Sequence, residues 1–153
     1  MKRVFSLLLA LVLCLACFPA AFAAEPEYEI LRETTEYLPD GTKVTVTLSV
    51  QPVRTRGRVY TVNGKRDYTY GSDWTFTVYG SFSVNEGVSV SCTSDSYGSS
   101  ISNTEWQMTF GTSGHSGATA TASGTMTRYY GGAPVQTVYP SISVSCDKYG
   151  NFS

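Results

Sequence analysis

One histidine lies beside a serine, and both are residue types that can take part in catalysis. His115 is the only histidine of the chain and lies in the sequence Gly114-His115-Ser116-Gly117-Ala118. This sequence partly matches the G-x-S-x-G motif, in which a serine at a strand-to-helix turn is activated by a separate histidine. Here the histidine adjoins the serine and no helix is predicted after it. The segment is therefore predicted to be a loop rich in glycine and serine, with no catalytic residue.

Two aspartates, Asp95 and Asp147, occupy equivalent positions in a sequence pattern that occurs twice in the chain, and they could lie close together at one end of the fold. A hard cation such as Ca²⁺ requires about six to eight oxygen ligands. Few other acidic residues neighbour either aspartate in the sequence. We therefore expect both residues to form turns, and the sequence predicts neither a metal site nor a cofactor site.

The first 23 residues are typical of a secretory signal peptide. Lys2 and Arg3 precede an apolar run over residues 4–18, and Ala-Phe-Ala at 21–23 is suited to cleavage. The apolar run is shorter than the roughly 20 residues that a membrane-spanning helix needs. A retained anchor and a lipoprotein cleaved before Cys17 are the alternatives. The sequence predicts a signal peptide at 1–23 and one secreted domain at 24–153, with no transmembrane segment in the mature chain.

The number and positions of the cysteines predict a disulfide bond. Cys14 and Cys17 would leave with the signal peptide, so Cys92 and Cys146 would be the two cysteines of the mature chain. An even number of cysteines in an exported protein favours a disulfide over a metal site or a nucleophile. Both cysteines alternate with aliphatic residues, so we predict a buried Cys92–Cys146 disulfide between two sheets.

Charge offers a candidate ligand surface. Loss of Lys2 and Arg3 would reduce the 11 basic residues to nine, against 12 acidic ones, so no general attraction to nucleic acid is expected. Arg54, Arg56 and Arg58 alternate, and in a strand they would point to one side. This surface could bind an anionic wall polymer, a glycan or a protein. The alternative is a solvated edge strand, or one paired with the acidic segment 25–40.

Alternating apolar and polar residues predict strands along the whole mature chain. The positions predicted to point inward include aromatic and aliphatic residues in the middle of the chain, small residues after them, and aliphatic residues near the C-terminus: Trp74, Phe76, Val78, Phe82, Val84, Val88, Val90, Trp106, Met108, Phe110, Ala118, Ala120, Ala122, Gly124, Met126, Ile142 and Val144. Pro39-Asp40-Gly41 predicts a turn, and Asn63-Gly64 predicts a tight hairpin. About eight or nine short strands at this spacing predict an antiparallel β-sandwich.

One sequence pattern occurs twice in the chain. TVYGSFSV at 77–84 and SVSCTSDSYG at 89–98 reappear, merged, in TVYPSISVSCDKYG at 137–150. In both copies the cysteine is followed by an aspartate and by Tyr-Gly. We interpret each copy as an inward-facing strand that ends in a turn, with Gly98 and Gly150 adopting the turn conformation.

The order Cys92, Trp106, Cys146 resembles the Cys…Trp…Cys pattern of immunoglobulin domains. Val144 stands where the tyrosine corner would be, and only seven residues follow Cys146. The resemblance therefore implies an immunoglobulin-like architecture with a non-standard topology.

The chain also resembles small exported bacterial proteins of unknown function. The similar elements are the acidic lead into Asp40-Gly41, the segment 74–82, the Cys…Trp…Cys pattern and the end Gly150 to Ser153. This resemblance implies secretion by a bacterium and carries no site residue. We expect a non-enzymatic binding module at the cell envelope or exterior. The alternatives are a bacteriocin-like toxin and a glycan-active hydrolase.

Overall fold

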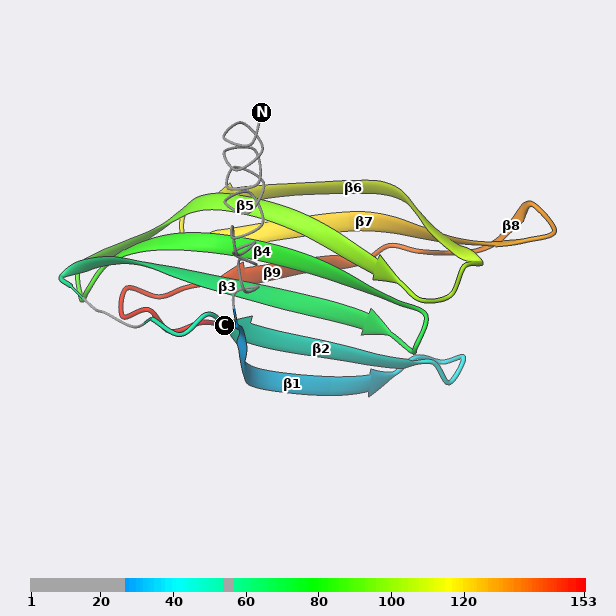
Figure 1. Cartoon of the computed structure of the whole chain (residues 1–153), viewed down its shortest axis with the longest axis horizontal. Coiled ribbons are helices and arrows are strands. Elements are labelled where there is room, and N and C mark those ends of the chain that lie inside the picture. The colour runs from blue at the N-terminus through cyan, green and yellow to red at the C-terminus, as the bar shows by residue number, and fades with distance from the viewer. Residues whose placement is uncertain (1–26, 54–56) are drawn as a thin grey trace, which may run out of the picture.

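The computed structural model describes residues 27–53 and 57–153, which form two antiparallel β-sheets (Figure 1). Sheet A is a meander of β1 (Glu29–Tyr37), β2 (Lys43–Val50), β3 (Val59–Tyr70), β4 (Trp74–Asn85) and β5 (Ser89–Ile101). Sheet B contains β6 (Trp106–Ser116), β7 (Thr119–Tyr130), β8 (Ala133–Val138) and β9 (Ser141–Ser145). One edge of β7 pairs with β6, and the other pairs with β8 and β9.

This architecture confirms the predicted all-β antiparallel sandwich. Because each strand of sheet A pairs with its neighbour in sequence, the topology also departs from the immunoglobulin arrangement, as predicted. The predicted signal peptide at 1–23, including Cys17, lies outside the described residues.

The core lies between the sheets and follows the predicted alternation in β4 and β7, but Val88 and Phe110, also predicted to point inward, are 62% and 58% exposed. Val88 lies in the turn before β5, and the register of β6 shifts between Met108 and Phe110. The inward residues of β4, namely Trp74, Phe76, Val78, Phe82 and Val84, are at most 2% exposed. On β7 the facing residues Ala120, Ala122 and Gly124 are also buried. A Cβ atom at Gly124 would lie 2.9 Å from the Phe76 ring. The large rings of β4 therefore occupy the space that the small residues of β7 leave free, as the sequence of β7 indicates.

The predicted hairpin at Asn63-Gly64 is wrong, because β3 runs through both residues. Asn63 pairs with Ser81 of β4, and its side-chain amide donates to Gln51 Oε1 at 2.8 Å. A Cβ atom at Gly64 would overlap the ring of Phe152. Gly64 therefore permits the C-terminal residues to pack on the sheet, and it is not a turn residue.

The two copies of the repeated sequence pattern end differently. In the second copy, Gly150 has a φ of 82° and the Asp147 carboxylate accepts the backbone N–H of Asn151, which confirms the predicted turn. In the first copy the turn prediction is wrong. Asp95 and Gly98 pair with β4 inside β5, since β4 is long enough to continue the ladder past Cys92. The same residue types thus turn the chain only where no partner strand extends the pairing.

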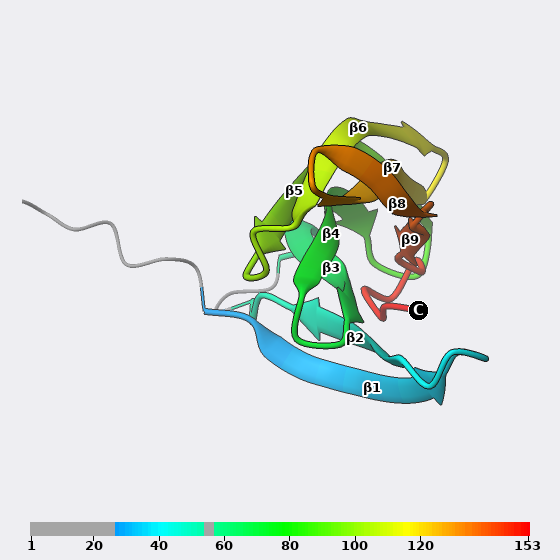
Figure 2. The same cartoon turned by 90° about the vertical axis from the view of Figure 1, so that its right-hand side faces the viewer.

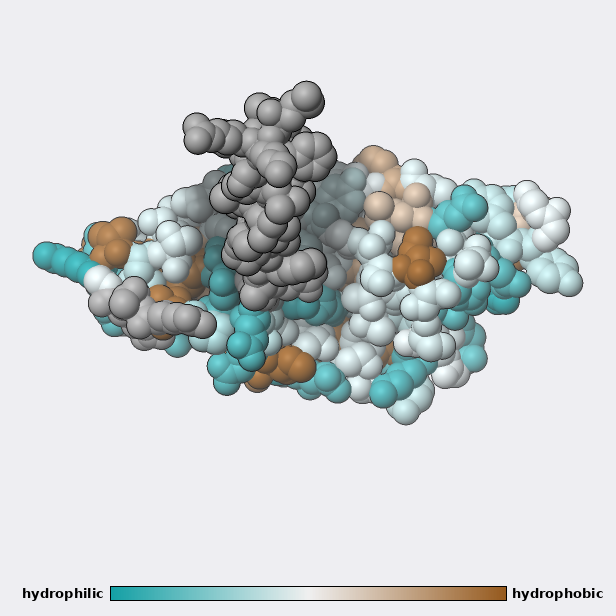
Figure 3. All heavy atoms as spheres, viewed as in Figure 1, coloured by the Kyte–Doolittle hydropathy of each residue, from teal (hydrophilic) through white to brown (hydrophobic). Residues whose placement is uncertain are grey.

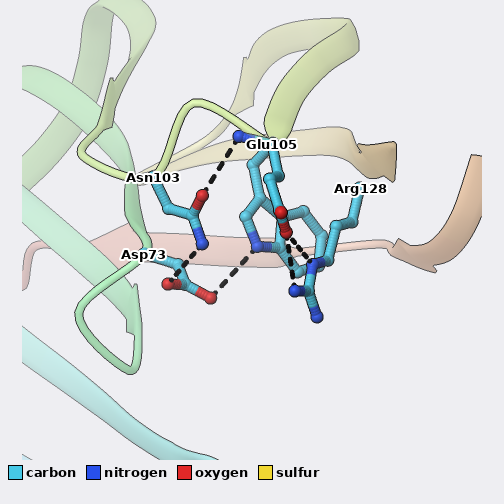
Figure 4. A network of polar contacts seen from close by, with 5 residues as sticks. Asp73, Asn103, Glu105 and Arg128 are labelled. Carbon is cyan, nitrogen blue, oxygen red and sulfur yellow. Dashed lines mark hydrogen bonds and ion pairs between the residues drawn. The ribbon is translucent and has the colours of Figure 1, made fainter. Parts of the chain in front are cut away.

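A polar network joins the ends of the two sheets (Figure 4). The Asp73 carboxylate, before β4, accepts hydrogen bonds from Asn103 Nδ2 and Trp106 Nε1, both at 3.0 Å. Arg128 of β7 donates from Nε to Glu105 at 2.8 Å. The Trp106 ring packs edge-on against Tyr70 and Trp74. The network therefore fixes the β5–β6 crossover against the aromatic end of the core.

Sheet A is wider than sheet B. The packing between the sheets involves β3, β4 and β5 on one side and β6, β7 and β9 on the other. The hairpin of β1 and β2 extends beyond that packing (Figure 2), and every residue of β1 is exposed. The inner face of this hairpin is consequently open to solvent along part of its length.

Candidate functional site

The arginine surface predicted from the sequence is mostly outside the structure's described part. Arg54 and Arg56 lie among residues 54–56, which are not described. Arg58 is exposed at a bend before β3, and its carbonyl accepts the backbone N–H of Glu86. The alignment of the three side chains therefore stays a prediction.

The structure brings His115 and Asp95 together, which the sequence did not predict. His115 Nδ1 lies 2.5 Å from Asp95 Oδ1, so the contact links the edge strands β5 and β6. Hydrogen bonds from Ser113 and His115 lower the pKa of the Asp95 carboxyl. Within the described residues, no hydroxyl is hydrogen-bonded to His115 Nε2. The pair therefore orients an imidazole and joins the two sheets, without the serine that a hydrolytic triad requires.

Asp95 and Asp147 have separate partners. Asp147 is engaged by Tyr149 and Asn151 in its own turn, and these hydrogen bonds lower the pKa of its carboxyl. No cluster of three or more metal-ligating His, Cys, Asp or Glu residues occurs in the described part of the chain.

Cys92 and Cys146 are both buried, as predicted, but both are free thiols in the structure. Their backbone N–H groups donate to the carbonyls of consecutive residues, Gly117 and Ala118. The turn between β6 and β7 thus lies against both cysteine backbones. Burial raises the pKa of the Cys92 thiol and raises that of Cys146 to about 12, so neither thiol is activated as a nucleophile.

A hollow of about 260 Å³ opens on the inner face of β1, β2 and β3, where sheet B does not cover sheet A. Register aligns Arg32, Leu48 and Arg66 in one row across the three strands. Val46 and Leu48 form the floor of the hollow, and side chains from β1 form its outer wall: Arg32, Thr34 and Glu36. Arg66 and Arg32 thus border the hollow from opposite strands.

The charges around this hollow are not balanced. Neither Arg32 nor Arg66 forms an ion pair with a carboxylate among the described residues. Arg66 Nε is buried and has no hydrogen-bond partner. Burial and, to a smaller extent, the charge of Arg32 lower the pKa of Arg66. By contrast, Lys65, on the opposite face of β3, is paired with Asp67 at 3.0 Å.

The sequence alone pointed to other arginines. Arg32 lies within the acidic segment 25–40, and Arg66 follows Lys65 just after the predicted Asn63-Gly64 turn. One signal was present: Arg66 has the same parity as Tyr68 and Tyr70, so it was a charged residue at an inward position. Its meeting with Arg32 depends on the pairing of three strands and on the width of sheet B.

Hollows also occur elsewhere: one of about 420 Å³ is lined by residues of β6 and β7 that include His115, and one of about 500 Å³ is lined by residues around the start of β3. On the face shown in Figure 3, hydrophobic residues lie singly or in small groups between polar ones. A membrane-spanning helix is not found among residues 27–53 and 57–153.

Comparisons with protein-family models, with curated proteins and with solved structures found no match.

Proposed function

We propose that this protein is a non-enzymatic binding module that acts outside a bacterial cell, and that its ligand presents an anionic group to Arg32 and Arg66. The observation that carries this proposal is the unsatisfied Arg66 Nε, buried beside a second guanidinium at an open hollow. Buried polar groups in native proteins nearly always have a partner. A ligand that brings acceptor oxygens to this point would supply the missing one.

The chemistry of two guanidinium groups supports an oxyanion as that ligand group. Each guanidinium presents donors in a planar fork that matches carboxylate and phosphate oxygens. The aliphatic stems can pack over Leu48, which is only 4% exposed, while the charged ends face the hollow. An anion would also relieve the repulsion between the two arginines. A wall polymer, a glycan or a protein segment could present such a group.

The test is retention of the mature protein on immobilised polygalacturonate, a carboxylated glycan, at low salt. We expect Arg66→Gln and Arg32→Gln each to weaken retention by about tenfold or more, since a hydrogen bond to a charged group contributes roughly 1.5–3 kcal/mol. Retention by the parent should fall as salt rises, because counter-ions screen the exposed part of the site.

The matched control is Arg58→Gln, which removes the same charge from an exposed bend outside the hollow. This variant should be retained as well as the parent, and all variants should be compared at equal folded fraction by circular dichroism. If Arg58→Gln loses retention and Arg66→Gln keeps it, the site lies in the arginine surface predicted from the sequence and our proposal is wrong.

If the protein is exported to an oxidising compartment, we expect Cys92 and Cys146 to form a disulfide. Protein purified from the culture medium should gain two hydrogens in mass on reduction. Thiol titration must be done on unfolded, unreduced protein, because both cysteines are buried in the folded state. We expect no titratable thiol. Two thiols in exported, unfolded protein would contradict the disulfide.

A further inference from the structure

The hollow has a second charged end, opposite in sign to the first. Glu36 lines it together with Arg32 and Thr34, all on the inner face of β1. Glu36 lies four positions after Arg32 along the strand, so their Cα atoms lie about 13 Å apart. No basic side chain forms an ion pair with Glu36 among the described residues. The hollow therefore presents two positive groups at one end and one negative group at the other.

An aromatic side chain, stacked on Trp74, lies near the negative end but is not among the residues that line the hollow. Tyr68 of β3 lies in the row of Thr34 and Val46, one row nearer to Glu36 than the arginine row is. Burial raises the pKa of Tyr68, and the charges of Tyr70 and Glu36 raise it further. The Glu36 carboxylate at this end suits a ligand ammonium, with which it can form a charge-assisted hydrogen bond.

We infer that the hollow binds a short zwitterionic peptide, with its terminal carboxylate at Arg32 and Arg66 and its ammonium at Glu36. This inference rests on the proposed function, because it assigns the anionic group to a peptide terminus. An extended chain spans about 3.3–3.6 Å per residue, so two to four residues bridge the charged ends once the side chains lean inward. The apolar floor of Val46 and Leu48 suits small aliphatic side chains.

A simple polyanion fits this arrangement less well than a zwitterion does. It would satisfy the arginines but would place negative charge beside Glu36, where like charges repel. A hollow of about 260 Å³ is also slightly below the size of typical drug-sized ligand sites, which favours a compact ligand. Amine and carboxylate at opposite ends of one small molecule meet both conditions.

The test uses trialanine, N-acetyl-trialanine and trialanine amide in chemical-shift titrations of the mature protein. Trialanine should bind with shifts in the Arg66 side-chain and β1 signals. Blocking either end should weaken binding by about tenfold or more, because each block removes one charge-assisted contact. Glu36→Gln should bind trialanine and N-acetyl-trialanine equally, and Arg66→Gln should do the same for trialanine and its amide. This pattern assigns each end of the peptide to its partner.

The matched control is Glu33→Gln, which removes a carboxylate from the opposite face of β1. It should leave all three affinities unchanged. If N-acetyl-trialanine binds the parent as well as trialanine does, or if trialanine does not bind, the inference is wrong. Retention on polygalacturonate that depends on Arg66 would still support the proposed function in that case. Loss of both results would overturn the function and the inference together.

Discussion

Replacement of Trp106 by alanine is expected to lower the free energy of unfolding by about 3–5 kcal/mol. Trp106 is 2% exposed, and its ring packs edge-on against Tyr70 and Trp74, with centroids 5.4 Å and 5.8 Å away. The substitution leaves a cavity at the aromatic end of the core and also removes a donor from the Asp73 carboxylate. Urea unfolding followed by circular dichroism measures the change.

Two variants separate the ring from the hydrogen bond. Trp106→Phe keeps most of the aromatic packing but leaves one Asp73 oxygen without its donor, so a smaller loss of about 1–3 kcal/mol is expected. Tyr139→Ala removes an aromatic ring that is 74% exposed, and it should change stability by no more than about 0.5 kcal/mol. Equal losses in Trp106→Ala and Tyr139→Ala would contradict the packing described for this end of the core.

The second large effect is expected from Gly124→Val, which should destabilise the protein by about 1–3 kcal/mol through overpacking. Gly124 is buried on β7, and an added Cβ would lie 2.9 Å from Phe76 Cε2 and 3.1 Å from Cζ. Phe76 is fully buried and cannot move away without disturbing its neighbours. Thermal and urea unfolding of the purified variant measure the loss.

Gly114→Val is the matched control on the neighbouring strand. A Cβ at Gly114 would meet no atom within 4 Å, and valine suits an exposed strand position, so stability should be equal or slightly higher. Combining Gly124→Val with Phe76→Leu should cost less than the sum of the two single changes, because the smaller side chain makes room for valine. Strict additivity would show that Phe76 does not cause the strain.

Much of the fold follows from local patterns in the sequence. Alternation of period two assigns the inner residues of β4 correctly, because successive side chains of a strand point to opposite faces. The small residues of β7 likewise indicate large partners across the core. Pro39-Asp40-Gly41 predicts a turn that the structure contains, with Gly41 at a φ of 82°. These features depend on a few neighbouring residues, which the sequence displays directly.

The candidate site depends on contacts between distant segments. Alternation could place Arg66 on an inward face, but it could not show that the face is uncovered there or that Arg32 lies in the same row. The wrong turn prediction at Asp95 has the same cause. The residues around Asp95 are typical of a turn, but β4 continues to pair with β5 at this point. The same cause applies to Gly64, which lies against Phe152 from the other end of the chain.

The sequence by itself therefore determined which residues of β4 and β7 enter the core and where some turns occur, because side chains along a strand alternate between its two faces. Tertiary structure decided the site. Strand register brought two arginines and a glutamate around one hollow, and the smaller width of sheet B left that hollow open. Register and coverage arise from pairing between residues far apart in the chain, and charges become a binding site only when that pairing sets their separation.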